Sequence, residues 1–371
     1  MNNTKAKSDI IPPPPKVLQH QNQHSEFLQQ IRGICIIAVV LIHTVGAPTG
    51  TEESYLLILT RGFINFPVAV FFFLSGFFNK STDHYFGEAN GKFVSRVVRL
   101  LVPYIFWTTF YLCVGFLLCK IAGKPFDLLR IPKSFLAGTA AGPLYFLHVL
   151  LQLTIITPIL VKIIRSESKF VSVLKWGLLG ITPLYILALY AYDFSAGKML
   201  PHYNLPCFAW FTLYYLGLLC ANGKISHNGF TGLPTAIMLA FTALFIAIWE
   251  GFVIYGQTGT EIFSLAISQI RFGSVLFSLA IINLILCLKS TNPPPNRFFS
   301  KLGDYSFGIY AFHMFWMTPL AFVCSRMIFF PEILPFVKIM QGGICVGITF
   351  LACKGAEKII GTDLSKLIGI R

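Results

Sequence analysis

The sequence predicts an all-α polytopic membrane protein with about ten transmembrane helices. Hydrophobic residues make up 55% of the 371 residues, whereas charged residues make up only 12%. A soluble domain carries about 25% charged residues, so about half of the charge expected of a soluble protein is missing. Apolar stretches long enough to cross a bilayer recur along the whole chain. These observations exclude a disordered chain, a disulfide scaffold or a coiled coil as the main architecture.

The two ends of the chain differ from the apolar middle. Residues 1–30 are polar and contain four consecutive prolines at positions 12–15, which predicts a disordered tail. This segment is not a signal peptide, because its lysines are not followed directly by an apolar core and a cleavage site. We expect one transmembrane domain over residues 31–360 and a short tail over residues 361–371.

Each crossing helix requires about 20 mainly apolar residues. The stretches that meet this requirement lie near residues 31–48, 55–78, 101–119, 144–164, 171–191, 206–221, 233–255, 262–288, 305–327 and 336–353.

The distribution of lysine and arginine predicts the orientation. Ten crossings place both termini on one side, and an N-terminus inside leaves twenty cations on the inner side and seven on the outer side. Arg61 and Arg271 lie within or near spans and complete the 29. The positive-inside rule therefore places both termini in the cytoplasm, with the loop at 121–140 as the weakest point. The net charge of +14 thus reflects topology, and we do not expect a nucleic-acid partner.

Two ionisable side chains share one face of the first predicted span. Arg32 and His43 are eleven residues apart, which places them within about 20° of each other around a helix and about 16 Å apart along it. Ionisable groups inside a span indicate function by default. We interpret them as an anion anchor at the cytoplasmic mouth and a general base deeper in the membrane. The alternative is an arginine that reaches the interface and a histidine that bonds a neighbouring helix.

Two further motifs follow along the chain. The small pair Ser75-Gly76 lies among bulky rings and permits the close approach of another helix or of a narrow ligand. Packing is the favoured interpretation, because the Gly-x-Ser-x-Gly nucleophile elbow is absent. Arg96 and Arg99 lie about 60° apart on a helix and can clasp one phosphate-rich group, or they anchor the chain to anionic lipid head groups.

Other chemistries find little support. His148 and His313 are each interpreted as hydrogen-bond partners between helices, although Tyr310 and His313 share a face. The nine cysteines are scattered without a Cys-x-x-Cys pair. We expect no metal and no ATP-driven transport, because neither a tight metal-ligand cluster nor a phosphate-cradling Gly-Lys loop is present.

Taken in order, these segments resemble the membrane acyltransferase-3 family of bacterial O-acyltransferases. The resemblance runs over essentially all predicted helices and rests on four ordered motifs, which are Arg32-Gly33 followed by His43, Phe72-Phe73-Leu74-Ser75-Gly76, Arg96-x-x-Arg99 with Pro103-Tyr104, and the stretch from Asp304 to His313. The last stretch is especially similar to that of the enterobacterial common antigen O-acetyltransferases. One departure is Tyr145 and its neighbours, because the family's usual His-Leu-Trp-Phe-Leu reads Pro-Leu-Tyr-Phe-Leu here.

The resemblance implies an acyltransferase-3 domain in the bacterial cytoplasmic membrane that uses acyl-CoA. It implies donor-binding roles for Arg96, Arg99, Ser75 and Tyr104, catalytic roles for His43 and Arg32, and acceptor-binding roles for Tyr310, His313 and Tyr145. The expected reaction moves an acyl group, acetyl or a somewhat longer one such as succinyl, to a hydroxyl of a surface or lipid-linked glycan. A covalent acyl intermediate, an acidic partner for His43 and the oligomeric state stay open.

A transporter or flippase for a glycolipid or acyl donor is the alternative from another class. Ten helices with buried polar residues fit it equally well in composition. Many transporters contain internal repeats, however, and neither arginine pattern recurs in the C-terminal half of the chain.

Overall fold

Every regular element of the computed structural model is a helix within the residues that the structure describes, which are 15–44, 51–79, 90–291, 293–294, 296–326 and 334–371. The α-helices are α1 (Pro15–Thr44), α2 (Thr51–Ile64), α3 (Pro67–Phe77), α4 (Asn90–Ile121), α5 (Arg130–Ala137), α6 (Tyr145–Arg165), α7 (Lys169–Gly177), α8 (Ile181–Ala196), α9 (Phe211–Ala221), α10 (Leu233–Thr258), α11 (Phe263–Ala266), α12 (Phe272–Ser290), α13 (Arg297–Asp304), α14 (Ser306–Ser325), α15 (Leu334–Ile360) and α16 (Thr362–Leu367). Three short 3₁₀ turns are Gly142–Leu144, Leu178–Gly180 and Cys207–Ala209.

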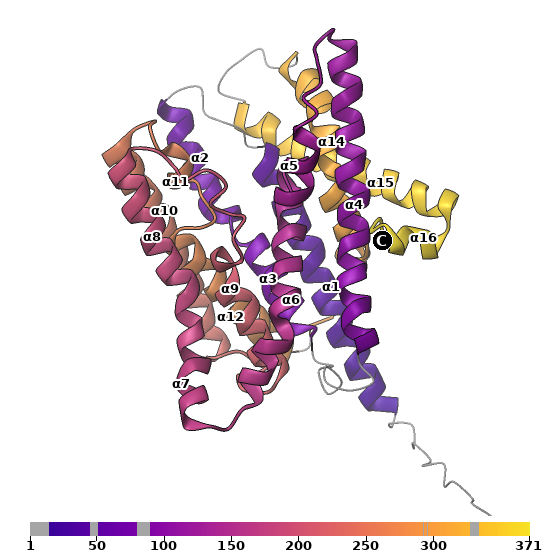
Figure 1. Cartoon of the computed structure of the whole chain (residues 1–371). Coiled ribbons are helices and arrows are strands. Elements are labelled where there is room, and N and C mark those ends of the chain that lie inside the picture. The colour runs from indigo at the N-terminus through magenta and orange to yellow at the C-terminus, as the bar shows by residue number, and fades with distance from the viewer. Residues whose placement is uncertain (1–14, 45–50, 80–89, 292, 295, 327–333) are drawn as a thin grey trace, which may run out of the picture.

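The predicted fold class is confirmed. Nine helical segments among the described residues are long and apolar enough to cross a membrane, and the long helices stand side by side as a bundle (Figure 1). Large apolar side chains are exposed on the outer surface, such as Phe241 and Phe245 of α10 at 69% and 70%. Lipid satisfies such a surface, whereas water does not. The protein is therefore a multi-pass membrane protein.

The predicted span at 206–221 differs from the other nine. Its helix, α9, has only 11 residues and a length of about 16 Å, which is about half the thickness of the hydrocarbon core. Every residue of α9 is buried. A fully buried core helix and a lipid-spanning helix are equally apolar, so composition alone does not separate them.

The stretch that leads into α9 nevertheless extends along α8 and α7. Residues 200–215 descend antiparallel to these helices through hydrogen bonds that join Leu200 to Asp193, Tyr203 to Tyr185, Phe208 to Thr182 and Tyr215 to Lys175. Irregular backbone at membrane depth is tolerated where protein buries it or where it lines a cavity. A tenth pass thus forms from an irregular stretch followed by a short helix.

Two other passes are interrupted at positions that face each other. α2 ends at Ile64 and α3 begins at Pro67, while residues 267–271 separate α11 from α12. Asn65 bridges the two breaks, because its Nδ2 donates to the carbonyl oxygens of Ile267 and Ser268, each at 3.1 Å. The amide satisfies carbonyls that the broken helix leaves without partners.

Helix α1 lies inside the bundle and contacts α2, α3, α12, α13, α14 and α15. It approaches α13 closely at two glycines, since a Cβ at Gly33 would lie 2.1 Å from the carbonyl oxygen of Phe299 and one at Gly303 1.9 Å from that of Gln29. α1 begins at Pro15 and buries Phe27 and Leu28, so a helix occupies the second half of the segment predicted as a disordered tail. Residues 1–14 lie outside the described residues.

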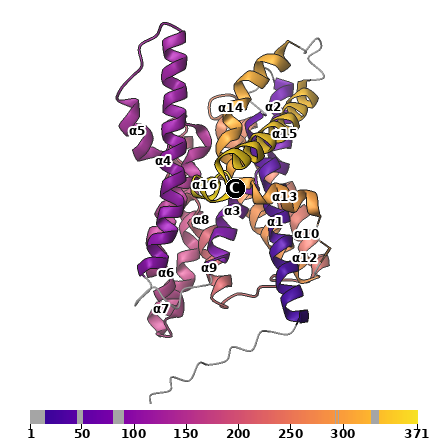
Figure 2. The same ribbon diagram turned by 90° about the vertical axis from the view of Figure 1, so that its right-hand side faces the viewer.

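The C-terminal residues fold back onto the bundle. α16 packs on α4 and α15, where the indole of Trp107 donates to the carbonyl oxygen of Ile368 at 3.1 Å. Arg371 pairs with Glu357 at 2.6 Å. The C-terminus lies at about half the height of the bundle in both views (Figures 1 and 2).

The small pair Ser75-Gly76 brings α3 against α9, as the packing interpretation predicted. A Cβ at Gly76 would lie 2.1 Å from the carbonyl oxygen of Tyr214, and one at Gly217 would lie 2.1 Å from that of Phe73. The two backbones therefore touch at a reciprocal pair of glycines. This contact fixes the position of Ser75 beside the core.

Substituting Gly76 with alanine is expected to lower the free energy of unfolding by about 1–3 kcal/mol, because the new methyl group meets backbone rather than a flexible side chain. Thermal unfolding of the purified protein measures the effect as a lower Tm. Gly256→Ala is the matched control, since Gly256 also lies in a helix but a Cβ there meets nothing within 4 Å. Equal Tm values for Gly76→Ala and Gly256→Ala would contradict the prediction.

Candidate active site

Three cavities follow one another through the bundle. The end of the bundle at which α4 begins and α6 ends is called the cationic end, because it carries Arg96, Arg99 and Arg165. The cationic cavity opens here with a volume of about 440 Å³. Its lining residues are Arg32, Ser75, Phe78, Asn79, Arg96, Arg99, Leu100, Leu150, Thr154 and Tyr214.

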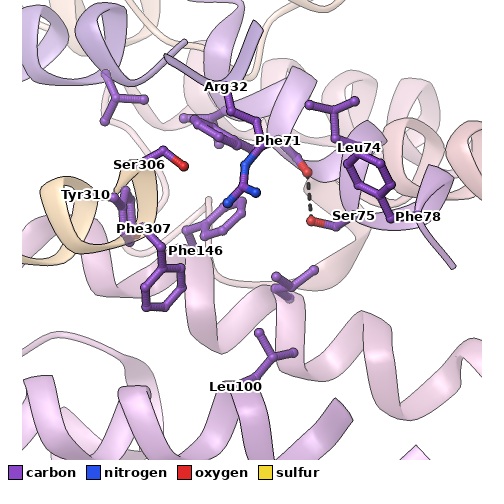
Figure 3. A pocket seen from close by; sticks show the side chains of 13 residues that line it. Arg32, Phe71, Leu74, Ser75, Phe78, Leu100, Phe146, Ser306, Phe307 and Tyr310 are labelled. Carbon is purple, nitrogen blue, oxygen red and sulfur yellow. Dashed lines mark hydrogen bonds between the residues drawn. The ribbon is translucent and has the colours of Figure 1, made fainter. Parts of the chain in front are cut away.

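The second cavity, the aromatic cavity, continues from the first and has a volume of about 250 Å³. Arg32 and Ser75 line both cavities. Figure 3 shows the guanidinium of Arg32 extending into the aromatic cavity above Phe146, with Ser75 at one side and Ser306 and Tyr310 at the other. The hydroxyl of Ser75 donates to the carbonyl oxygen of Phe71 at 2.8 Å (Figure 3).

A chain of hydrogen bonds holds Arg32 in place. The NH1 group of Arg32 donates to Oε1 of Gln29 at 2.9 Å, and Nε2 of Gln29 donates to Oδ1 of Asp304 at 2.8 Å. Asp304 is the last residue of α13, which packs on α1 through Gly33. The motif residues Arg32, Gly33 and Asp304 are thereby joined in one structure.

The third cavity, the histidine cavity, has a volume of about 240 Å³ and lies beyond the aromatic cavity. The interrupted passes supply much of its wall, because Tyr203, Asn204 and Trp210 come from the stretch before α9 and residues 269–270 from the break before α12. Its polar and aromatic lining residues are His43, Arg61, Tyr145, Tyr203, Asn204, Trp210, Gln269 and Tyr310.

Val39, Val68 and Tyr310 line both the aromatic and the histidine cavities and form the boundary between them. The hydroxyl groups of Tyr310 and Ser306 are buried, and neither makes a well-aligned hydrogen bond within the described residues. A buried hydroxyl without a partner is costly. A ligand or water that occupies these cavities would supply the missing bonds.

His43 has a second histidine as its neighbour. The ring centroids of His43 and His313 are 5.2 Å apart, with an angle of 42° between the rings. Nδ1 of His313 lies 3.0 Å and 2.8 Å from the carbonyl oxygens of Ile309 and Tyr310, so it carries the ring proton, because a carbonyl oxygen only accepts. Nε2 of His313 is buried without a partner and is left as a proton acceptor.

Comparison with known protein families identifies the family to which this sequence is similar. The sequence model of a family described as an acyltransferase domain, acyltransferase-3, matches residues 25–353. The chain belongs to the acyltransferase-3 family. No curated protein and no solved structure matches the chain. The matched region contains every residue that lines the three cavities.

The acyltransferase brings most of the predicted site residues to the cavities. Arg96 and Arg99 line the cationic cavity, Arg32 and Ser75 line the two cavities nearest the cationic end, and His43 and Tyr145 line the histidine cavity. Along α1, the residues Arg32, Val39 and His43 face the cavities in turn. The predicted shared face of Arg32 and His43 is thus confirmed.

Tyr104 and His313 lie elsewhere in the acyltransferase. The hydroxyl of Tyr104 donates to the carbonyl oxygen of Phe135 at 2.6 Å, so this residue fastens α4 to α5 and lines none of the three cavities. His313 is fully buried beside His43 and also lines none of them. His313 therefore contacts the site only by packing against the ring of His43.

Sequence reasoning missed Arg61, Trp210, Tyr203 and Gln269 of the histidine cavity. Arg61 carried a usable signal, because an ionisable residue inside an apolar span indicates function by default. The other three lie in the interrupted passes, where no periodicity assigns a side chain to a face. Only the folded chain brings them together.

Proposed function

We propose that this acyltransferase moves an acyl group from acyl-CoA to a hydroxyl of a surface or lipid-linked glycan at the bacterial cytoplasmic membrane. The observation that carries the proposal is the succession of cavities from Arg96 and Arg99 through Arg32 to His43. The acetyl group and the glycan acceptor follow from the resemblance to O-acetyltransferases of bacterial glycans.

The donor enters from the cationic end in this proposal, which the positive-inside rule assigns to the cytoplasm. The guanidinium groups of Arg96 and Arg99 match the phosphate oxygens of CoA, because a guanidinium binds an oxyanion through two parallel hydrogen bonds. The pantetheine arm then extends through the aromatic cavity past Arg32 and Ser75. The unpartnered hydroxyls of Ser306 and Tyr310 offer bonds to its amides and to the thioester.

The chemical step takes place at the boundary between the aromatic and the histidine cavities. His43, as a neutral imidazole, accepts the proton of the acceptor hydroxyl while the hydroxyl oxygen forms a bond to the thioester carbon. The carbon–sulfur bond then breaks, and the CoA sulfur leaves with the electron pair and takes up the proton that His43 accepted. Tyr310 donates a hydrogen bond to the carbonyl oxygen as negative charge develops on it. His313 packs against the ring of His43 from outside the three cavities and helps to position it.

The first experiment measures release of free CoA thiol from acetyl-CoA by the purified protein in lipid nanodiscs, with and without lipid-linked bacterial glycans. We expect thiol release that the acceptor stimulates, together with an acetyl ester on the glycan. Tight acetyl-CoA binding with no thiol release under any condition would overturn the proposal. That result would favour transport of an acyl donor by the same bundle.

A further inference from the structure

The histidine cavity contains a positive charge that the described residues do not neutralise. The NH1 group of Arg61 donates to the carbonyl oxygen of Ile42 at 2.9 Å, and its guanidinium makes no other hydrogen bond within the described residues. Nε of Arg61 is buried without a partner. No carboxylate in the described part of the chain pairs with this guanidinium.

A structural role accounts for only part of Arg61. Ile42 lies in the last turn of α1, where helix carbonyls have no partner within the helix. Arg61 therefore caps α1 and complements the negative end of its dipole. A guanidinium has five N–H donors, however, and the cap uses one of them. The structural role thus leaves most of these donors unused, and Arg61 lines the cavity that also contains His43.

The half-buried carboxylate of Glu250 already has other partners. Glu250 lies 3.8 Å from Nε of Arg271, which is fully buried. Its two oxygens also accept from the hydroxyl of Tyr190 at 2.8 Å and from the backbone N–H of Gly273 at 2.9 Å. Arg271 thus has a carboxylate partner, whereas Arg61 has none among the described residues. An unpaired buried charge is costly, and inside a membrane bundle such a residue marks a ligand site by default.

The remaining lining of the cavity suits a polar ring. Tyr145 and Trp210 present nearly parallel rings, with centroids 6.3 Å apart and an angle of 28°. Oε1 of Gln269 is buried without a partner and accepts hydrogen bonds. A volume of about 240 Å³ lies below the range of about 300–1,000 Å³ typical of sites for drug-sized molecules, and it fits one sugar ring.

We propose that Arg61 binds an anionic group of the acceptor, a carboxylate or a phosphate, and thereby presents a neighbouring hydroxyl to His43. This inference rests on the proposed function, because it assigns the acceptor side of the same reaction. It identifies the acceptor as an acidic glycan or as a sugar phosphate rather than a neutral sugar. The two sources share one chemistry, which is an oxyanion that neutralises the guanidinium through two hydrogen bonds.

Arg61 has one competing role at this site. A guanidinium next to the reacting atoms can also stabilise the oxyanion of the tetrahedral intermediate. The two roles predict different sugar binding when acyl-CoA is absent. An acceptor-binding Arg61 discriminates between charged and neutral sugars without acyl-CoA, whereas an oxyanion-stabilising Arg61 does not.

The test is binding of three probes to the full chain in nanodiscs without acyl-CoA, followed by saturation-transfer NMR. The probes are methyl β-D-glucoside, methyl β-D-glucuronide and methyl β-D-glucoside 6-phosphate, which share a ring and differ in charge. We expect the wild-type protein to bind at least one anionic probe about tenfold more tightly than the neutral one. The stronger anionic probe distinguishes a carboxylate acceptor from a phosphate acceptor.

Three variants test whether Arg61 causes the preference for anionic probes. Arg61→Gln is expected to remove it, and Arg61→Lys to retain most of it. Arg130→Gln removes an exposed cation of α5 and is expected to change nothing. A wild-type protein that prefers neither anionic probe overturns the proposal, whether or not the variants fold. So does a preference that Arg61→Gln leaves intact.

The experiments can overturn the anion site and the proposed transferase reaction independently of each other. If the anion preference depends on Arg61 but acetyl-CoA is never turned over, the anion site stands and the transferase reaction falls. If acetyl-CoA is turned over and no anion preference exists, the reaction stands and the acceptor is neutral.

Discussion

Replacing His43 with alanine is expected to lower the rate of acyl transfer about 10²–10⁴-fold, which is the usual contribution of a general base. The Kd of acetyl-CoA is expected to stay at the wild-type value, because His43 lines the histidine cavity and not the two cavities assigned to CoA. The measurement pairs the rate of ester formation on the glycan with the equilibrium binding of acetyl-CoA.

The matched control is His148→Ala. His148 is another half-buried histidine of a membrane helix, but it lines none of the three cavities and packs near Tyr104, with ring centroids 6.3 Å apart. We expect this variant to retain the wild-type rate. Full glycan acylation by His43→Ala at equal protein abundance would remove His43 from the chemistry. A joint loss of rate and of donor binding would mean that the substitution disturbs the bundle.

His313→Ala tests the partner of His43 in the same assay. His313 carries its proton on Nδ1, and its Nε2 has no hydrogen-bond partner. The centroids of the His313 and His43 rings are 5.2 Å apart. Because His313 acts as a positioning residue, we expect His313→Ala to lower kcat less than His43→Ala does. The Kd of acetyl-CoA should stay unchanged. A shift in the pH dependence of kcat would distinguish this role from simple packing, and an unchanged pH profile with unchanged kcat would contradict it.

The part of the site that lies on regular helices was predictable from the sequence. Arg32 and His43 share a face because eleven residues complete almost three turns, and this relation holds wherever the helix packs. Arg96 and Arg99 lie at the same end of the bundle as Arg32, as the distribution of cations indicated. The helical period and the charge pattern are local properties, so they do not depend on tertiary contacts.

The other side of the site depends on the interrupted passes. Tyr203 and Trp210 reach the histidine cavity because residues 200–215 pair with α8 and α7 through side-chain hydrogen bonds, which no local pattern specifies. The composition of α9 also misled the length assignment, because a buried helix of 11 residues is as apolar as a spanning one. Tyr104 illustrates the converse. It belongs to an ordered motif, but its hydroxyl serves the contact between α4 and α5.

Replacing both Arg96 and Arg99 with glutamine is expected to raise the Kd of acetyl-CoA by about 10- to 100-fold. A hydrogen bond to a charged group contributes about 1.5–3 kcal/mol, and about 1.4 kcal/mol corresponds to a factor of ten in Kd. The contribution of Arg99 to this increase in Kd is expected to lie at the lower end of the energy range, because its side chain is exposed and water screens its charge. The effect should diminish with added salt, as expected of exposed charges.

A truncated donor distinguishes phosphate recognition from a general effect on the bundle. S-acetylpantetheine keeps the thioester and the arm that reach His43, but it lacks every phosphate of CoA. We expect the double variant and the wild-type protein to use S-acetylpantetheine at equal rates, because the groups that the two arginines bind are absent from it. The control variant Arg165→Gln/Lys169→Gln removes two cations from the same end that line none of the three cavities, and acetyl-CoA should bind it as tightly as wild type. Equal losses for acetyl-CoA and S-acetylpantetheine in the Arg96/Arg99 variant would show that these arginines support the fold. A loss confined to acetyl-CoA places the CoA phosphates at the cationic cavity and fixes the direction in which the donor approaches His43.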